Sequence, residues 1–314
     1  MTRDGSWDRQ MTSNEQRAAA KPLRLIYGCM RIAGDGSAAA RARGLAALDA
    51  AFAAGIRHFD HADIYADGAC ETLFGEWLRA HPGRRDDLTI ISKCGIRRPQ
   101  PGNPPLPQHY DFSPGHIEAS VAGSLERLGI DRLDMLLLHR PDYLMAPDAV
   151  ADCLAKLHAG GAIASAGVSN FSISQLRLLA SKSHLPLAAN QIEFSLAEVR
   201  ALDNGLLDTC LELGVVPQAW SPLAGAVDTH RRDDLAAAQR HSLALELQRQ
   251  ADVYALEAWQ IALCWLLAHP AGVVPVIGTL TPERIDASVD ALSVAYDHVD
   301  WYRLLEARNG HPVP

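Results

Sequence analysis

The feature that most constrains this chain is a series of short apolar segments that each end in polar residues. The clearest three lie far apart in the sequence: 58–65 (HFDHADIY), 88–93 (LTIISK) and 135–139 (MLLLH). The interior of a strand rarely tolerates Asp, Lys or His without a partner. Their repetition where apolar runs stop predicts that Asp60, Tyr65, Lys93 and His139 converge at one site, on the rim of a barrel.

From Leu23 onward, short apolar strands alternate with longer helical stretches, which is the rhythm of repeated βα units and a parallel sheet. Eight strands are predicted, at 24–27, 56–59, 88–92, a run ending at His139, 165–168, 187–190, 215–219 and 273–276. Helices are predicted at 45–54, 71–80, 147–159, 204–213, 255–267 and 299–308, and after Ser113, Ser172 and Thr281. Eight units with polar ends favour closure into an α/β (β/α)8 TIM barrel, with the active site at the C-terminal rim of the strands.

A doubly wound α/β sheet is the alternative, because alternating strands and helices suit it equally. No G-x-G-x-x-G lies between the first strand and the first helix, so a Rossmann cofactor site is unsupported. With 314 residues, 48% of them hydrophobic, the chain has the length of one barrel. We expect a flexible tail at residues 1–20 and a single domain at 21–314. Two long loops, 95–112 and 221–240, are expected to be functional.

The composition of the chain limits the kinds of molecule that it is expected to bind. The formal net charge is -8 and no Lys/Arg block occurs, which gives no electrostatic reason to expect nucleic acid or an anionic membrane. The six cysteines show no C-x-x-C pairing, which argues against a disulfide framework and a structural zinc site. Neither a secretory signal nor a membrane-spanning run is evident. We therefore expect a cytoplasmic protein that binds a small molecule.

Further motifs follow the polar strand ends in order along the chain. They are Gly167-Val168-Ser169-Asn170-Phe171, Asn190-Gln191-Ile192-Glu193, Ala219-Trp220-Ser221-Pro222-Leu223, Val276-Ile277-Gly278-Thr279 and Glu283-Arg284. From about Leu25 to the C-terminus, this order resembles that of the aldo-keto reductases, which reduce carbonyls with a nicotinamide cofactor on a (β/α)8 barrel. With Trp220 where many relatives have Tyr, the chain resembles most a bacterial branch of NADPH-dependent oxidoreductases. The resemblance also implies a monomer.

The resemblance implies four catalytic residues, and each suits its role chemically. Tyr65 would be the general acid that protonates the carbonyl oxygen, where negative charge builds up in the transition state. Lys93 would lower the pKa of that phenol toward the working range, and Asp60 would hold Lys93 in place. His139 would donate a hydrogen bond to the same oxygen and orient the carbonyl.

The resemblance also implies the cofactor contacts. Ser169, Asn170 and Gln191 would bind the nicotinamide carboxamide, and Trp220 would offer a flat face to its ring. The remaining expected contacts are Met30 and Asp60 beside the nicotinamide, Ser221, Leu223 and Gly225 along the pyrophosphate, and Gly278, Thr279 and Arg284 near the adenosine phosphate.

Arg284 favours NADPH through a grip on the 2'-phosphate, with NADH as the alternative. The chain departs from the commoner family pattern here, since Gly278 stands where many relatives carry Lys, and Ala287 and Ser288 replace a Glu and an Asn.

Other interpretations stay open on the sequence alone. A cofactor-binding regulatory or sensing subunit with little turnover is one, and a metal-dependent barrel isomerase or hydrolase is another. His58 and His61 have a spacing that suits a metal, but no further ligands gather near them, so no metal is expected. Cys29 and Cys94 are expected to be small buried hydrophobes. The substrate depends on the loops that follow the strands.

Overall fold

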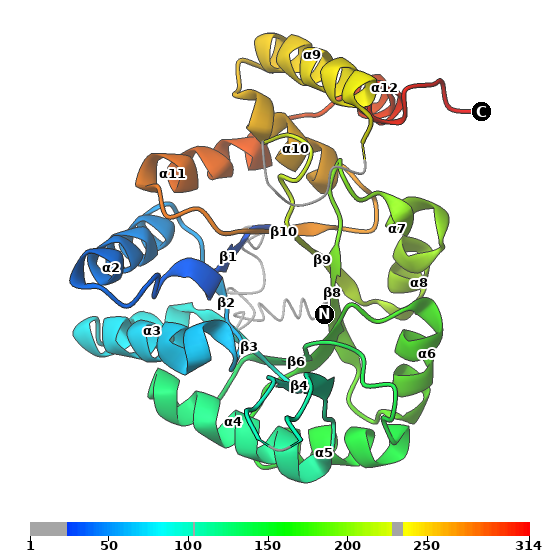
Figure 1. Ribbon diagram of the computed structural model, residues 1–314. Coiled ribbons are helices and arrows are strands. Elements are labelled where there is room, and N and C mark those ends of the chain that lie inside the picture. The colour runs from blue at the N-terminus through cyan, green and yellow to red at the C-terminus, as the bar shows by residue number, and fades with distance from the viewer. Residues whose placement is uncertain (1–23, 103, 228–234) are drawn as a thin grey trace, which may run out of the picture.

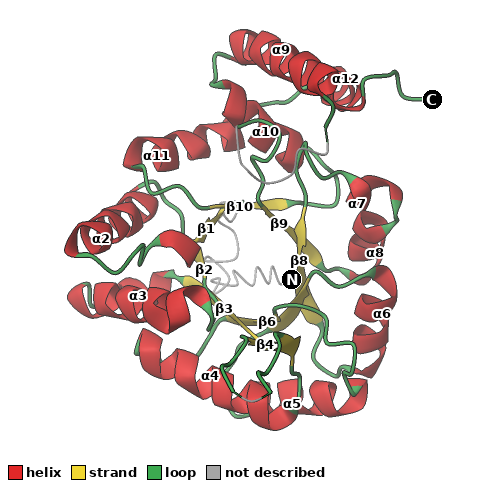
Figure 2. Ribbon diagram, viewed as in Figure 1, coloured by secondary structure: helices red, strands yellow, loops and turns green. Residues whose placement is uncertain are grey.

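The computed structural model describes residues 24–102, 104–227 and 235–314. Within these residues, parallel strands pair in a closed ring and helices surround it (Figures 1 and 2). In order around the ring they are β1 (Ile26–Gly28), β10 (Val274–Ile277), β9 (Val216–Trp220), β8 (Leu187–Glu193), β7 (Ala166–Ser169), β6 (Met135–Leu138), β3 (Thr89–Cys94) and β2 (His58–Asp60). The predicted (β/α)8 barrel is confirmed. The expected tail at residues 1–20 lies outside the described residues.

Closure of the ring depends on β1, which pairs with β10 on one side and with β2 on the other. Gly28 lies opposite Asp60 and Asp60 lies opposite Ile91, so the first three strands run in step. A closed parallel barrel leaves no open edge, and all its strands end in polar loops at the same rim.

The outer layer consists of one helix after each strand, with extra helices after β8, after β9 and at the C-terminus. The helices are α2 (Ala38–Ala53), α3 (Ala69–Ala80), α4 (Pro114–Leu128), α5 (Pro147–Ala159), α6 (Ile173–Lys182), α7 (Arg200–Asp203), α8 (Leu206–Leu213), α9 (Ala237–Tyr254), α10 (Ala258–Leu267), α11 (Pro282–Asp290) and α12 (His298–Asn309). Ser172 forms the expected cap of α6, a capping box with Gln175. Ser113 precedes α4, but its side chain makes no capping bond.

The largest differences from the sequence-based prediction concern three segments. Helix α2 begins at Ala38 instead of residue 45, under a Ser37 cap that accepts from Ala40 N, because its first two turns are alanine-rich and show no apolar period. The expected irregular loop 95–112 contains a small antiparallel hairpin, β4 (Ile96–Arg97) and β5 (His109–Tyr110). Helix α9 was not predicted, since the loop was expected to run to residue 240 and the next helix to begin at 255.

The barrel has two apolar regions. A small one fills the lumen and consists of Ile26, Ile91, Leu137, Ala189 and Val276. The larger one lies between the outside of the sheet and the helices, and it runs from Leu25 to Leu304. Successive side chains of a strand point to opposite sides, so each strand contributes to both regions. Residues at the ends of the strands that point inward then form a polar layer above the lumen.

Candidate active site

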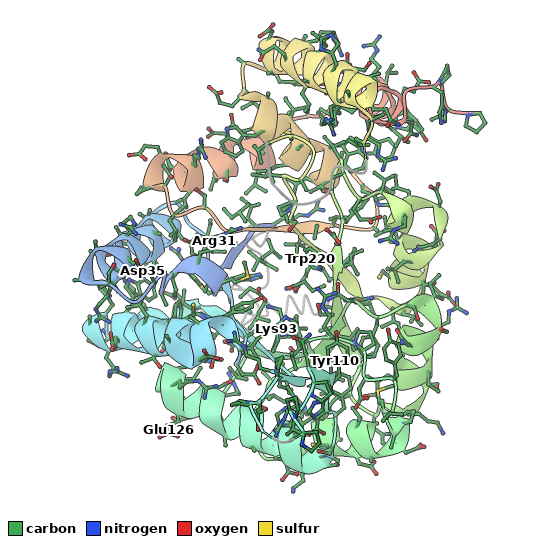
Figure 3. The ribbon with its side chains drawn as sticks, viewed as in Figure 1. Arg31, Asp35, Lys93, Tyr110, Glu126 and Trp220 are labelled. Atoms are coloured by element: carbon green, nitrogen blue, oxygen red, sulfur yellow. The ribbon has the colours of Figure 1, made fainter. Side chains whose placement is uncertain are left out.

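Alternation along the strands brings the predicted catalytic residues together. In β3, Ile91 belongs to the apolar lumen, so Lys93, two residues later, also points inward, one layer higher. Asp60 ends β2, and His139 follows the last residue of β6. Lys93 and Trp220 lie within the ring of strands (Figure 3). The structure therefore brings the three strand-end residues to one place, as the sequence predicts.

Lys93 is the centre of this arrangement, with 1% of its surface exposed. Its amine donates to Asp60 Oδ2 at 2.7 Å, to His61 O at 2.9 Å and to Tyr65 Oη at 3.0 Å. An ammonium group has three N–H donors, so each donor has one acceptor. Burial lowers the pKa of Lys93, but the interactions with Asp60 and Tyr65 outweigh it, and the net pKa is raised. The buried amine therefore stays charged.

Tyr65 corrects one expectation. The sequence predicts that Lys93 lowers the pKa of the Tyr65 phenol, whereas in the structure the net pKa is raised. Burial is the largest cause, and the nearby Asp60 carboxylate adds to it, while Lys93 opposes both. The sequence shows the cation but not how much water the fold removes from the ring. The phenol therefore keeps its proton at neutral pH.

His139 lies beside the phenol, with its ring edge to face with that of Tyr65 at 5.9 Å between centroids. Burial, followed by the positive charges of Lys93 and Arg140, holds the pKa of His139 well below its usual range. The imidazole is therefore neutral and carries a single N–H. Its Nδ1 has no hydrogen-bond partner among the described residues. A neutral imidazole in this position can orient a polar ligand without adding charge.

The backbone around Tyr65 is unusual. Ala66 (φ 48°), Asp67 (φ 53°) and Gly68 (φ 86°) are all left-handed, a conformation that non-glycine residues avoid. Arg98, just after β4, donates to Ile64 O and pairs with Asp67 at 2.7 Å. Backbone strain of this kind persists where the surroundings impose it, and it concentrates at functional sites.

The residues predicted to bind a carboxamide form one hydrogen-bonded group. Asn170 Nδ2 donates to Ser169 Oγ at 2.8 Å and to His139 O at 3.3 Å, while its Oδ1 accepts from Trp220 Nε1 at 2.9 Å. Ser169 Oγ donates to Gln191 O at 2.9 Å. The polar atoms of Ser169 and Asn170 are thus largely used within the protein, where they fix the Trp220 ring.

Gln191 joins this group to the predicted catalytic residues. Its Nε2 donates to Asp60 Oδ1 and to Gln218 Oε1, both at 3.0 Å. Both amide hydrogens are used, and Oε1 accepts from no described residue, so this oxygen is free to accept a hydrogen bond from a ligand. Gln218 was missed by sequence reasoning, although it lies two residues before Trp220 on β9 and so points to the same side.

The remaining predicted cofactor residues follow β1, β9 and β10 on the same rim. Met30 is 41% exposed, and Arg31 Nη1 donates to Gly278 O at 3.1 Å. A Cβ at Gly278 would lie 3.1 Å from that Arg31 nitrogen, so the missing side chain leaves room for the guanidinium. Thr279 O accepts from Tyr27 Oη at 2.9 Å.

The last predicted contacts lie in the turn after β9 and at the start of α11. Ser221 (φ 52°) and Gly225 (φ 89°) are left-handed, and Leu223 is partly buried between them. Arg284 lies in the first turn of α11 and is exposed. Arg284 and Arg31 thus place exposed positive charge on the arc of the rim formed by the loops after β1 and β10.

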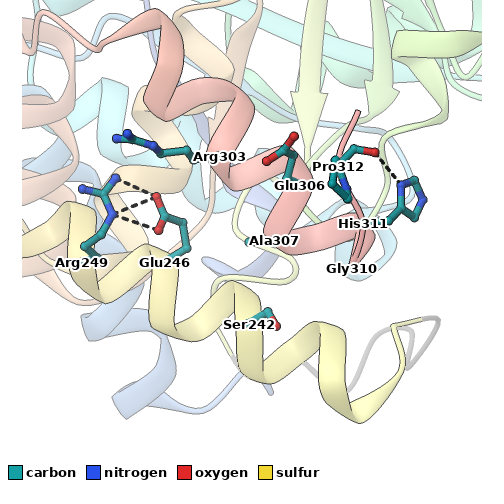
Figure 4. A pocket seen from close by; sticks show the side chains of 9 residues that line it. All are labelled: Ser242, Glu246, Arg249, Arg303, Glu306, Ala307, Gly310, His311 and Pro312. Atoms are coloured by element: carbon teal, nitrogen blue, oxygen red, sulfur yellow. Dashed lines mark hydrogen bonds and ion pairs between the residues drawn. The ribbon is translucent and has the colours of Figure 1, made fainter. Parts of the chain in front are cut away.

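Other features of the described residues do not form part of this candidate site. A charged groove of about 650 Å³ lies between α9 and α12, outside the barrel, and none of its lining residues belongs to the catalytic loops (Figure 4). Among the described residues, no group of three or more His, Cys, Asp or Glu could hold a metal ion. All six cysteines are buried and free, as expected for Cys29 and Cys94. No described helix is long and apolar enough to cross a membrane.

Comparison with known proteins gives consistent matches. The sequence profile of the Aldo/keto reductase family matches residues 24–309. The chain is 42% identical over 264 residues to the uncharacterized oxidoreductase YcsN of Bacillus subtilis, covering 83% of this chain and 86% of the relative. It is 38% identical over 291 residues to a 6-dehydroglucose reductase of Agrobacterium fabrum, covering 92% and 95%. The solved aldo/keto reductase of Klebsiella pneumoniae, in complex with NADP and acetate, matches with a TM-score of 0.74 and 26% identity over 93% of this chain and 92% of that one.

Proposed function

The chain belongs to the aldo/keto reductase family, and from this premise we propose that it is an NADPH-dependent reductase of aldehydes or ketones in which Tyr65 is the general acid. The observation that carries the proposal is the contact between Lys93 Nζ and Tyr65 Oη at 3.0 Å, with Asp60 on the other side of the same amine. A charged, fully bonded lysine beside a protonated phenol is the arrangement that proton donation to a carbonyl oxygen requires.

The residues present fit the proposed cofactor. Gln191 Oε1 is free to accept from a carboxamide N–H, and Asp60 and Gln218 fix its orientation. Trp220 is held by Asn170, so its ring has a defined plane. Arg284 is exposed, as recognition of a phosphate requires, and a guanidinium suits a phosphate in particular. When bound, NADPH supplies the hydride for the carbonyl carbon.

The chain's own side chains then act on the carbonyl oxygen. Tyr65 donates its proton as negative charge develops there, and Lys93 stabilises the phenolate that remains. His139, kept neutral by its surroundings, orients the oxygen by hydrogen bonding. Asp60 balances the buried charge of Lys93 in both states of the phenol.

Substrate class is proposed from the relatives. Two of them, from Agrobacterium fabrum and Novosphingobium aromaticivorans, carry the name 6-dehydroglucose reductase, at 38% and 36% identity. We therefore place polyhydroxylated aldehydes first among the substrates to test. Arg98 and Arg140, on the loops after β3 and β6, provide polar groups beside the catalytic residues that suit such a ligand.

The test measures NADPH oxidation with polyhydroxylated aldehydes, aromatic aldehydes and diketones, for the wild type and for Tyr65→Phe. We expect turnover of at least one class and a loss of kcat of about 10² to 10⁴ in the variant, the usual contribution of general acid catalysis. Titration with NADPH and NADH gives the cofactor preference and should show unchanged NADPH binding in the variant. Equal turnover by both proteins would remove Tyr65 from its role.

We also propose that residues 21–314 act as one domain and that the enzyme is a monomer. The larger apolar region supports a single domain, because it is continuous from Leu25 on the first strand to Leu304 on the last helix. Sedimentation equilibrium measures the mass directly, and a species near the chain mass of 34.0 kDa is expected.

A further inference from the structure

A buried cluster of charged and hydroxyl side chains lies between β3 and the helices α3 and α4. At its centre is Glu71 on α3, which is fully buried. Its Oε1 accepts from Ser92 Oγ at 2.5 Å, and its Oε2 accepts from Arg127 Nε at 2.8 Å. The same Oε2 lies 2.7 Å from Arg127 Nη2 in an ion pair. Arg127 Nη2 also donates to Ser124 Oγ at 3.3 Å. The Arg127 guanidinium thus balances a carboxylate that has no access to water, which is an expensive charge to leave unpaired.

The cluster is joined through the backbone to both residues of the proposed proton donor. Ser92 precedes Lys93 in β3, so Ser92 points outward to the cluster where Lys93 points into the barrel. Asp63 lies two residues before Tyr65, and its N–H donates to Lys93 O at 3.0 Å. A shift of the cluster would therefore move the backbone that carries the amine and the phenol.

Arg127 also packs against Gly68, in the left-handed turn 66–68 that follows Tyr65. A Cβ at Gly68 would lie 2.6 Å from Arg127 Cδ and 2.8 Å from its Nε, so the arginine side chain packs against the bare glycine backbone. Gly68 ends the left-handed run that begins at Ala66. Three consecutive left-handed residues persist only where neighbouring side chains hold them, and the aliphatic part of Arg127 packs against the last of the three.

A second carboxyl group depends on the same cation. Burial, followed by the charge of Glu71, raises the pKa of Asp63 to about 6, while Ser120 and Arg127, both on α4, lower it. On β3 the neighbouring titratable group is the buried Cys94 thiol. Asp63 Oδ1 has no hydrogen-bond partner among the described residues. Arg127 is thus ion-paired with Glu71, and its positive charge also opposes the effect of burial on Asp63.

We propose that Arg127 is a positioning residue for Tyr65: it neutralises Glu71 and packs against Gly68, and so holds the left-handed turn that keeps the phenol within hydrogen-bonding distance of Lys93. The inference rests on the proposed role of Tyr65 as the acid. Arg127 acts through the turn and not on the reacting atoms.

The test is a double-mutant cycle between Arg127→Met and Tyr65→Phe, with kcat measured in single-turnover NADPH oxidation and NADPH binding measured by fluorescence. Displacement of a catalytic group by about 1 Å can reduce a rate by about 10². We expect Arg127→Met to reduce kcat by about 10- to 100-fold while the dissociation constant for NADPH changes less than twofold. In the Tyr65→Phe background, Arg127→Met should have almost no further effect on kcat, because the residue that it positions is gone.

Two additional variants separate positioning from general stability. Arg85→Met is the matched control, because the Arg85 side chain is 29% exposed and that of Arg127 is 31% exposed, and both arginines form ion pairs. Arg85 lies near the other end of β3, away from the Tyr65 turn, so its replacement should change kcat less than twofold. Arg127→Lys keeps the cation and should recover most of kcat. If Arg127→Met does not fold, Arg127→Gln replaces it in the cycle, because it also removes the cation but keeps a polar side chain beside Glu71.

These measurements distinguish a wrong role for Arg127 from a wrong role for Tyr65. If Tyr65→Phe keeps full turnover, the acid is misassigned, whatever Arg127 does. If Tyr65→Phe loses turnover but Arg127→Met keeps it, or if the two losses multiply, Arg127 does not act through Tyr65 and the inference is overturned.

Discussion

The two ends of the β3 strand carry ion pairs of similar length in opposite settings. At the C-terminal rim, Lys93 and Asp60 lie 2.7 Å apart with side chains that are 0% and 3% exposed. At the N-terminal base, Arg85 and Asp134 lie 3.0 Å apart with side chains that are 29% and 18% exposed. Asp134 also accepts from Ile90 N at 2.8 Å, which ties the base of β3 to the segment before β6.

The difference extends to the neighbouring polar groups. His61, Asp63 and His139, close to the predicted catalytic residues, have buried polar atoms without a partner among the described residues. Their pKa values are shifted toward the neutral form, mainly by burial. At the base, the pair of Arg85 and Asp134 keeps contact with water and with the backbone. Unpartnered buried groups at the rim therefore cost stability, as is common at functional sites, whereas the ion pair at the base contributes stability.

The largest expected effect comes from breaking the pair at the rim. Lys93→Met leaves the Asp60 carboxylate buried and unpaired, so we expect a loss of about 3 to 5 kcal/mol in the free energy of unfolding and loss of activity. Arg85→Met should cost only about 1 kcal/mol, because water can solvate Asp134. Urea denaturation at pH 7 measures both values. Similar losses for the two variants would contradict the contrast between rim and base.

The next prediction concerns replacement of a carboxyl group by an amide, which should stabilise the protein at the rim of the barrel and destabilise it at the base of β3. Folding raises the pKa of Asp63 from 3.8 to about 6, so the folded protein holds more protons than the unfolded chain between these values. Stability from this group is therefore lost as pH rises through that window, and the penalty is complete above about pH 6. We expect Asp63→Asn to stabilise the protein at pH 8 by up to about 3 kcal/mol, and by almost nothing at pH 4.

Asp134→Asn is the matched control at the base. It should destabilise at pH 8, since it weakens the contact with Arg85. Melting temperatures of both variants at pH 8 and pH 4 give the comparison, and a destabilised Asp63→Asn at pH 8 would show that the rim carboxyl group is not strained.

A smaller effect is expected from His61, whose ring packs on Phe74 at 4.6 Å. Burial, with help from Lys93, lowers the pKa of His61 to about 3. The unfolded chain then binds more protons between about pH 3 and 6.5, so stability that is present above 6.5 is lost on acidification. From pH 7 to pH 5 this group should account for about 2 kcal/mol.

His61→Leu should therefore show a fall in unfolding free energy that is about 2 kcal/mol smaller than in the wild type over the same pH range. Replacement of the exposed His158 by Leu is the control and should leave the fall unchanged. An unaltered pH dependence in His61→Leu would mean that this imidazole is solvated in the folded protein.

Local sequence pattern explains why much of the fold, and the meeting of the candidate catalytic residues, could be predicted. Asp60, Lys93 and His139 each end an apolar run, and parallel strands deliver their ends to one rim, so the convergence of these residues follows from alternation alone. Helix α9 escaped prediction because its apolar residues form no strong periodic stripe, and several stay exposed, including Leu245 and Val253. The hairpin of β4 and β5 escaped because its strands have only two residues each.

The candidate site was predictable only where chemistry follows from residue type and strand position. Gln218 was missed because an amide on a strand suggests nothing until its partner, Gln191, is known from the structure. The direction of the Tyr65 pKa was missed for a related reason, because a lysine nearby is visible in the sequence and the loss of water around the ring is not.

The sequence by itself determined the barrel, the edge at which its polar strand ends meet, and the family. Periods of two and 3.6 residues act locally, and each strand carries its own signal. The tertiary structure alone decided which carboxyl groups lie near the same cation. Asp63, Glu71 and Arg127 come from separate segments, and they meet beside Ser92 only when β3, α3 and α4 pack. Burial and charge balance depend on all neighbours at once, so they exist only in the folded protein.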